Sequence, residues 1–190
     1  DSLSLLTTSH TTGANALTAF QATSAATAQA ARMVARLRAE HPNYWPETIR
    51  ALVIHSAEWT EPMLEQLNSP AGKKDRYPLM RRFGYGVPDF DRASASARDH
   101  LALVAQAAIQ PFRLKGQREF NECHYYQLPL PAAILEDLQN TVVELKVTLS
   151  YFVDPNPGFS ANVDPQRYQS FGLRFDLQRR GELAERFKQR

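Results

Sequence analysis

A run of small residues behind a Thr-Ser pair constrains the fold of this chain more than any other feature. Thr23 and Ser24 open the run, and five of the seven residues 25–31 are Ala. Such a segment forms a helix readily, and its first turns carry no bulk, which suits burial under a sheet. The sequence therefore predicts a helix from about residue 25 to 41, with Ser24 where the first unpaired backbone N–H groups converge.

The predicted helix has one apolar stripe and a defined end. The stripe has the i, i+3, i+4, i+7 spacing of a buried helical face, and its members are Ala30, Met33, Val34 and Leu37. Pro42 ends the helix, because the residue before a proline is driven out of helical geometry. The spacing therefore predicts that this stripe faces the interior.

A second helix is predicted to begin at Pro46, since proline is favoured at the first helical position. Glu47 places a negative charge in the positive first turn. Its expected inner face consists of Ile49, Leu52, Val53 and Ser56. Farther on, prolines, a glycine and basic residues are mixed in the segment from Glu61 to Arg82. This composition indicates a surface excursion, that is, an irregular segment on the surface of the protein.

Ser24 at a helix start has two interpretations. A serine there can attack a carbonyl carbon while the helix N-terminus, with its free donors and partial positive charge, faces the developing oxyanion. Ser and Thr are also ordinary capping residues, and capping alone would account for Thr23 and Ser24.

Several linked motifs in residues 4–98 resemble the C-terminal part of a subtilisin-like serine protease domain. They are Thr23-Ser24 with its Ala-rich helix, the turn His41-Pro42-Asn43, the helix that ends in Ser56-Ala57, and Gly84-Tyr85-Gly86-Val87-Pro88 before Asp91-Arg92-Ala93. Linked motifs in the right order are far more specific than any one of them. The resemblance implies hydrolysis of peptide bonds through an acyl-enzyme on Ser24, whose own N–H is one oxyanion donor, with Thr23 in a supporting role.

Three positions depart from the family pattern. Ala22 stands where the family has Gly, Ala28 where Pro is common, and Gln29 where His is frequent. Ala22 and Ala28 favour an alternative, a non-catalytic binding or interaction protein in which a vestigial subtilase half supports a partner-binding domain. A third possibility, an α/β hydrolase or esterase, lacks the Gly-x-Ser-x-Gly elbow.

In subtilases the triad Asp and His precede the Ser along the chain. Before Ser24 this chain offers only Asp1, His10 and Asn15, none of them in a motif like the family's, and it begins with Asp. His10 is better interpreted as a loop residue. We therefore expect a fragment that is inactive alone, with a polypeptide as substrate and the missing N-terminal half of its own catalytic domain as partner.

The second half of the chain changes from helical periodicity to alternation. Two segments alternate apolar and polar residues, Val143 to Val153 and Phe171 to Leu177, while Leu101 to Ile109 and Tyr125 to Leu130 are weaker strand candidates. The expected fold is α/β, the C-terminal part of a subtilisin-like catalytic domain (residues 1–98) followed by an antiparallel β-sandwich domain (99–178). A charged tail, 179–190, is expected to be a truncated helix.

Charge and composition narrow the classes of partner that this chain is expected to bind. The tail 179–190 holds five of the 22 Lys and Arg and two of the 20 Asp and Glu, so the rest has a net charge of −1. This excludes a broad basic face for nucleic acid, and the long uncharged stretch near the N-terminus is too rich in Ser, Thr and Ala to span a membrane. Cys123, the single cysteine, fits a reducing compartment, although secreted subtilases also lack disulfides.

Neither a metal nor another cofactor is expected. Asp154-Pro155-Asn156-Pro157-Gly158 resembles a calcium loop only superficially, because the glycine comes one place early and Pro165 occupies the twelfth position. The five histidines show no zinc spacing. Cys123 beside His124 does not form a nucleophile–base pair, since neighbours on a strand point to opposite faces, and a small buried hydrophobe is expected there.

Overall fold

The computed structural model describes residues 4–10, 13, 16–69, 72–98, 102–129, 132–139, 141–142, 144–153, 172–179 and 181–189. Contacts divide the chain into two compact units, Asp1–Lys146 and Val147–Arg190, and each is described by itself. The domain boundaries predicted at residues 98 and 178 stay predictions.

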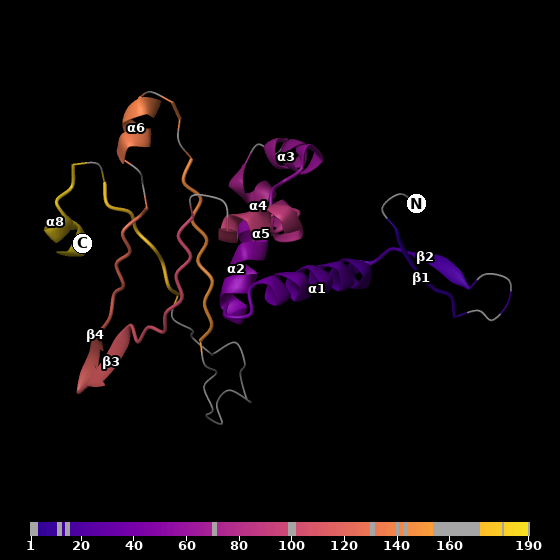
Figure 1. Ribbon diagram of the computed structural model, residues 1–190, viewed down its shortest axis with the longest axis horizontal. Coiled ribbons are helices and arrows are strands. Elements are labelled where there is room, and N and C mark those ends of the chain that lie inside the picture. The colour runs from indigo at the N-terminus through magenta and orange to yellow at the C-terminus, as the bar shows by residue number, and fades with distance from the viewer. Residues whose placement is uncertain are drawn as a thin grey trace. The chain divides into compact units, whose positions relative to one another are not determined.

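Helices dominate the first part of the chain (Figure 1). A hairpin of β1 (Leu5–Thr8) and β2 (Leu17–Phe20) comes first. The helices that follow are α1 (Thr23–Glu40), α2 (Pro46–Ser56), α3 (Glu61–Asn68), α4 (Lys73–Phe83) and α5 (Phe90–Arg98). Beyond them lie a second hairpin, β3 (Phe112–Lys115) with β4 (Gln117–Phe120), and the short helices α6 (Ala132–Leu138) and α8 (Ala184–Gln189).

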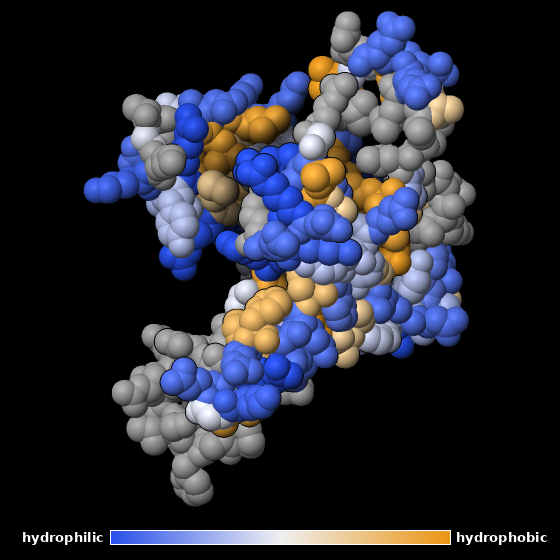
Figure 2. Space-filling view, turned by 90° about the vertical axis from the view of Figure 1, so that its left-hand side faces the viewer, coloured by the Kyte–Doolittle hydropathy of each residue, from blue (hydrophilic) through white to orange (hydrophobic). Residues whose placement is uncertain are grey.

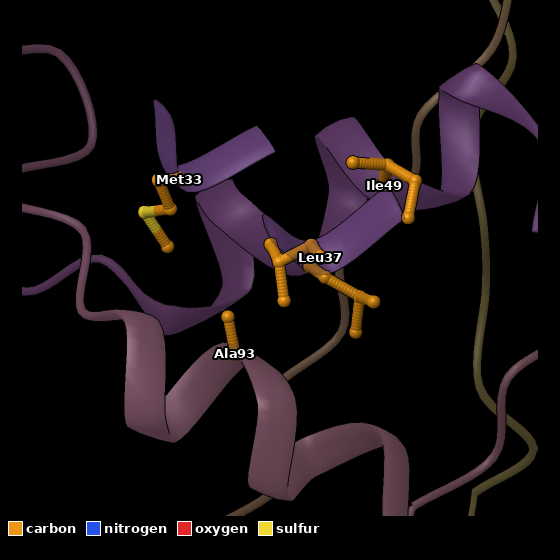
Figure 3. Packing of buried hydrophobic residues seen from close by; sticks show 5 residues of the cluster. Met33, Leu37, Ile49 and Ala93 are labelled. Atoms are coloured by element: carbon orange, nitrogen blue, oxygen red, sulfur yellow. The ribbon is translucent and has the colours of Figure 1, made fainter. Parts of the chain in front are cut away.

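The hydrophobic core lies where α1, α2 and α5 meet. Its buried members are Met33 and Leu37 from α1, Ile49 and Leu52 from α2, and Ala93 from α5. Figure 3 shows Leu37 between the other helices, with Ala93 approaching it from α5. The small side chain of Ala93 lets the α5 backbone come close to α1, so three short helices share one cluster.

Part of the apolar stripe predicted for α1 was wrong. Met33 and Leu37 are buried as expected, but Ala30 and Val34 are exposed, and the third buried residue of α1 is Ala25. No sheet covers α1 among the described residues. The helix therefore forms as predicted, and only the narrow face toward α2 and α5 is buried.

The second helix matches its prediction closely. α2 begins at Pro46 with Glu47 in its first turn, and Ile49, Leu52 and Ser56 are buried. The Gln106 side chain caps its start, because Gln106 Oε1 accepts hydrogen bonds from Trp45 N–H and from the Thr48 hydroxyl, both at 2.6 Å.

Beyond α2 the chain makes a close backbone contact. Glu58 and Val87 form an isolated antiparallel bridge, with Glu58 N–H donating to Val87 C=O at 3.1 Å and Val87 N–H to Glu58 C=O at 2.8 Å. Gly86 stands at this contact with φ +100°, and a Cβ there would lie 2.2 Å from Glu58 O. Only glycine fits this turn.

The surface excursion predicted for residues 61–82 is two helices packed against each other, α3 and α4. Pro62 occupies the first turn of α3, where proline is tolerated, but Pro78 lies inside α4. The interior proline is why the composition indicated a loop rather than a helix.

The predicted β-sandwich is not shown. The described residues contain two sheets, each a two-stranded hairpin. Residues 102–110, 144–153 and 172–179 carry no assigned strand, and Leu145, Val147 and Leu149 are exposed. Figure 2 shows apolar patches, in orange, breaking the hydrophilic surface in several separate places. The sandwich stays a prediction, and Asp154 to Gly158 lie outside the described residues.

Candidate active site

The β1–β2 hairpin leads the chain into α1. The two strands are antiparallel, with Leu5 opposite Phe20 and Thr8 opposite Leu17. Next to the helix, the Gln21 side-chain amide donates to the Ser4 hydroxyl at 2.5 Å. The second strand of the hairpin ends at Phe20, and the first turn of α1 begins at Thr23, only two residues later.

The N-terminus of α1 carries no cap from a side chain. Ala22, at the N-cap, makes no side-chain hydrogen bond, and no acidic residue lies in the first turn. Ala22 C=O accepts from the N–H groups of Ala25 (3.0 Å) and Ala26 (3.3 Å). The N–H groups before Ala25 precede the first helical hydrogen bonds, so donors and the positive end of the helix dipole remain available there.

Ser24 lies in this uncapped first turn, as the sequence predicts. Its side chain is exposed, and no hydrogen bond of its hydroxyl or its N–H to another described residue is present. Thr23 precedes it, and Thr23 C=O accepts a hydrogen bond from the Thr27 hydroxyl at 2.8 Å. That bond fastens the first turn of the helix and leaves the Ser24 hydroxyl outside it.

Ala22, which stands where the subtilisin-like sequence pattern has glycine, is accommodated without backbone strain. Its φ of 176° and ψ of 174° are fully extended and need no glycine. The other two departures, Ala28 and Gln29, lie on exposed positions of α1. None of the three disturbs the geometry of the helix start.

No histidine is brought to Ser24 within the described residues. His10 follows β1 at the turn end of the hairpin, and the register from Phe20 to Leu17 alone separates it from the helix by about 10 Å. Asp1, Asn15 and His100 lie outside the described residues.

The other helical histidines lie near the hydrophobic cluster, not near Ser24. Met33, the first cluster residue of α1, is about 13 Å along the helix axis from Ser24. His41 ends α1 and stacks on Tyr44, with ring centroids 4.9 Å apart. His55 lies in the last turn of α2.

His55 occupies a charged and partly buried position at the end of α2. Burial lowers the pKa of His55, and the nearby Lys146 ammonium lowers it further. Lys146 Nζ donates to Ala57 C=O at 3.1 Å, at the C-terminus of α2 where a cation is favourable. His55 is therefore a half-buried imidazole whose protonation is disfavoured by burial and by Lys146.

Cys123 is exposed, so the expectation of a small buried hydrophobe was wrong. The segment around it is extended and carries no assigned strand. Its neighbours do alternate as predicted. The side chains of Tyr125 and Cys123 form a hydrogen bond with each other, and the rings of His124 and Tyr126 form an edge contact with each other. Each residue thus interacts with the residue two positions away and not with its immediate neighbour. Cys123 and His124 therefore do not pair.

The described residues contain no group of three or more His, Cys, Asp or Glu placed to hold a metal ion. Among the same residues, no helix has the length and apolar character needed to cross a bilayer.

Comparison with known proteins relates the first part of the chain to one family. Residues 1–86, a little under half of the chain, match the model of the subtilase family. No curated protein and no solved structure matches the chain. The matched residues include the hairpin, Ser24 and all of α1 and α2, so this part is similar to a family of serine proteases.

Proposed function

We propose that this protein acts as a subtilisin-like serine endopeptidase with Ser24 as its nucleophile. One observation carries the proposal, the exposed Ser24 in an uncapped, acid-free helix start within the part that matches the subtilase family. A capping serine bonds to the N–H of N2 or N3, and Ser24 makes no such bond. The hydroxyl is therefore available for chemistry.

The helix start suits the charge that develops in acyl transfer. Ser24 Oγ attacks the carbonyl carbon of a peptide bond while an imidazole takes its proton, and the carbonyl oxygen becomes an alkoxide. Ser24 N–H and the positive end of α1 stabilise that alkoxide. The imidazolium then protonates the leaving amine, and water hydrolyses the acyl-enzyme. Thr23 supports the turn through its carbonyl bond to the Thr27 hydroxyl.

The imidazole and its orienting carboxylate are proposed to come from an N-terminal half of the catalytic domain outside these 190 residues. Two features support this. No described histidine reaches Ser24, and α1 exposes Ala26, Ala30 and Val34, small or apolar residues that a catalytic domain would cover. The substrate is proposed to be a polypeptide.

The test is labelling by a fluorophosphonate probe in the protein joined to its upstream region. We expect labelling and cleavage of an unfolded protein, with both lost in Ser24→Ala. Ser69→Ala, an exposed serine at the end of α3, is the matched control and should change neither. Retention of both activities in Ser24→Ala would refute the assignment. An unreactive wild type would favour the non-catalytic interaction protein instead.

A further inference from the structure

The Thr27 hydroxyl is turned back onto the backbone of α1, one helical turn after Thr23. It donates to Thr23 C=O at 2.8 Å, although Thr27 is exposed and water could take the same bond. In an α-helix the Thr23 oxygen also accepts from Thr27 N–H, so two donors of one residue hold it. A bond to the fourth residue back is common for threonine in helices and does not by itself imply a function.

The carbonyl that Thr27 holds belongs to the same peptide unit as Ser24 N–H. This unit is trans, since the described chain contains no cis peptide bond. A trans peptide is planar, and its C=O and N–H point in opposite directions, so whatever fixes the oxygen also fixes the direction of the N–H. A hydrogen bond to the oxygen also polarises the unit and makes its N–H a stronger donor. The Thr27 hydroxyl therefore acts on Ser24 N–H from the far end of the same peptide.

Ser24 N–H is available to use this gain. It precedes the first helical hydrogen bonds of α1 and has no partner among the described residues. Ser56 provides the contrast, because its hydroxyl donates to Val53 C=O at 2.8 Å in the last turn of α2. There the N–H of the same peptide unit belongs to Ile54 and is used inside the helix. Only at the start of α1 does such a bond strengthen a donor that points out of the helix.

We propose that Thr27 is a positioning residue of the peptidase reaction, which orients and polarises Ser24 N–H toward the oxyanion. The inference rests on the proposed function, in which Ser24 N–H donates to the alkoxide formed when Ser24 Oγ attacks a peptide carbonyl. Thr27 contacts neither the substrate nor the reacting atoms and acts through the Thr23–Ser24 peptide. Its effect is largest when the alkoxide is fully charged, so it stabilises the transition state and not the bound substrate.

The size of the effect follows from the donor on which Thr27 acts. Loss of a whole oxyanion donor lowers kcat by about 10²- to 10³-fold. Connected hydrogen bonds strengthen one another by roughly 10–30%, and that share of the same free energy corresponds to about two- to eightfold in kcat. A variant without the Thr27 hydroxyl should therefore keep much of its activity, unlike Ser24→Ala.

The first test is kinetic and uses the protein joined to its upstream region, with a peptide amide as substrate. Thr27→Val replaces the hydroxyl by a methyl group at similar helix propensity, and it should lower kcat and kcat/KM equally, about two- to eightfold, with KM unchanged. Thr27→Ser keeps the hydroxyl and should behave like the wild type. Thr18→Val is the matched control, because Thr18 is exposed on β2 and its hydroxyl bonds to no other described residue.

A peptide aldehyde inhibitor separates positioning from a purely structural role. Its adduct with Ser24 Oγ carries an oxyanion in the place that the substrate oxygen takes in the transition state. The inhibition constant should therefore rise in Thr27→Val by the same factor by which kcat falls. It should stay at the wild-type value in Thr27→Ser and Thr18→Val.

The second test observes the Ser24 amide directly, in the 190-residue chain and without catalysis. The sequence contains two Thr-Ser pairs, Thr8-Ser9 and Thr23-Ser24. Threonine labelled with ¹³C at the carbonyl carbon and serine labelled with ¹⁵N therefore leave two amide signals in a carbonyl-filtered NMR spectrum. Thr27→Val should move the Ser24 amide proton upfield, because its N–H is less polarised, and should leave the Ser9 signal in place. Thr27→Ser should leave both signals unchanged.

The outcomes separate this inference from the proposed function. An unchanged Ser24 amide signal in Thr27→Val would overturn the role of Thr27. So would an active protein in which Thr27→Val keeps the wild-type kcat, raises only KM, or has the same effect as Thr18→Val. A wild type with its upstream region that neither reacts with the fluorophosphonate probe nor cleaves would refute the proposed function, and the role of Thr27 with it.

Discussion

Two regions of this chain carry equally regular hydrophobic patterns and bury them very differently. In the helices between residues 23 and 98, Leu37 is fully buried and Ile49 is 3% exposed. In the extended segment 144–153, Leu145 and Leu149 alternate with polar residues just as regularly, yet they are 48% and 44% exposed. A clear pattern therefore predicts burial in one region and not in the other.

The difference lies in where each kind of element finds its hydrogen bonds. A helix satisfies its backbone within a few residues, so α1 and α2 need only one another and α5 to bury a stripe. A strand must find a second segment, often far away in the chain, before its backbone or its apolar face is satisfied. The two sheets of the described residues are hairpins joined by nearby residues.

The largest expected effect concerns catalysis, because the proposed nucleophile, Ser24, lies in the helical region and no described histidine contacts it. The 190-residue chain alone should cleave an unfolded protein on the order of 10⁴- to 10⁶-fold more slowly than the protein with its upstream region. Single-turnover assays with both proteins measure this ratio. Sustained cleavage by the chain alone would point to a base within it, with His10 and His55 the first to replace.

A pair of leucine truncations measures the contrast in burial directly. Leu37→Ala removes a fully buried side chain from the three-helix cluster and should lower the free energy of unfolding by about 3 kcal/mol. Leu145→Ala makes the same change at a half-exposed position and should cost less than about 1 kcal/mol. Urea titrations give both values. Equal costs would mean that the extended region is packed after all.

Two glycines with positive φ make a second pair. Gly86→Ala places a Cβ against the Glu58 backbone and should destabilise the protein by about 2–3 kcal/mol. Gly116, between β3 and β4, has φ +75°, and a Cβ there would have no described residue beyond its chain neighbours within 4 Å. Gly116→Ala should therefore cost only about 1 kcal/mol. Thermal unfolding distinguishes them, and a reversed order would contradict the close contact at Gly86.

The smallest effect is a pH dependence from His55. Because burial and Lys146 lower its pKa, the folded protein binds this proton less readily than the unfolded chain does. The contribution of His55 to the free energy of unfolding is therefore fully present above its unfolded pKa of about 6.5. It is lost as the pH falls toward the lower pKa that His55 has in the folded protein. His55→Gln should flatten that fall. In the Lys146→Met variant, an NMR titration should show a His55 pKa closer to its usual value. An unchanged pKa would mean that Lys146 does not contribute to the lowered pKa of His55.

Sequence reasoning was most successful where local rules decide the outcome. It predicted the limits of α1 within two residues, the start of α2 at Pro46 and the buried face with Ile49 and Leu52. It also placed Ser24 at the helix start. It missed α4 because of Pro78, and it missed the β3–β4 hairpin, although Gly116 between two short alternating segments was a usable signal.

The sequence by itself determined which segments are helical and where the serine stands, because capping, proline positions and helical periodicity act within a few residues. Only the tertiary structure decided which side of α1 is buried. Ala30 and Val34 satisfy the helical spacing as well as Met33 does, but α2 and α5 reach only the side that carries Met33 and Leu37. Burial depends on which partner arrives, and periodicity contains no information about that.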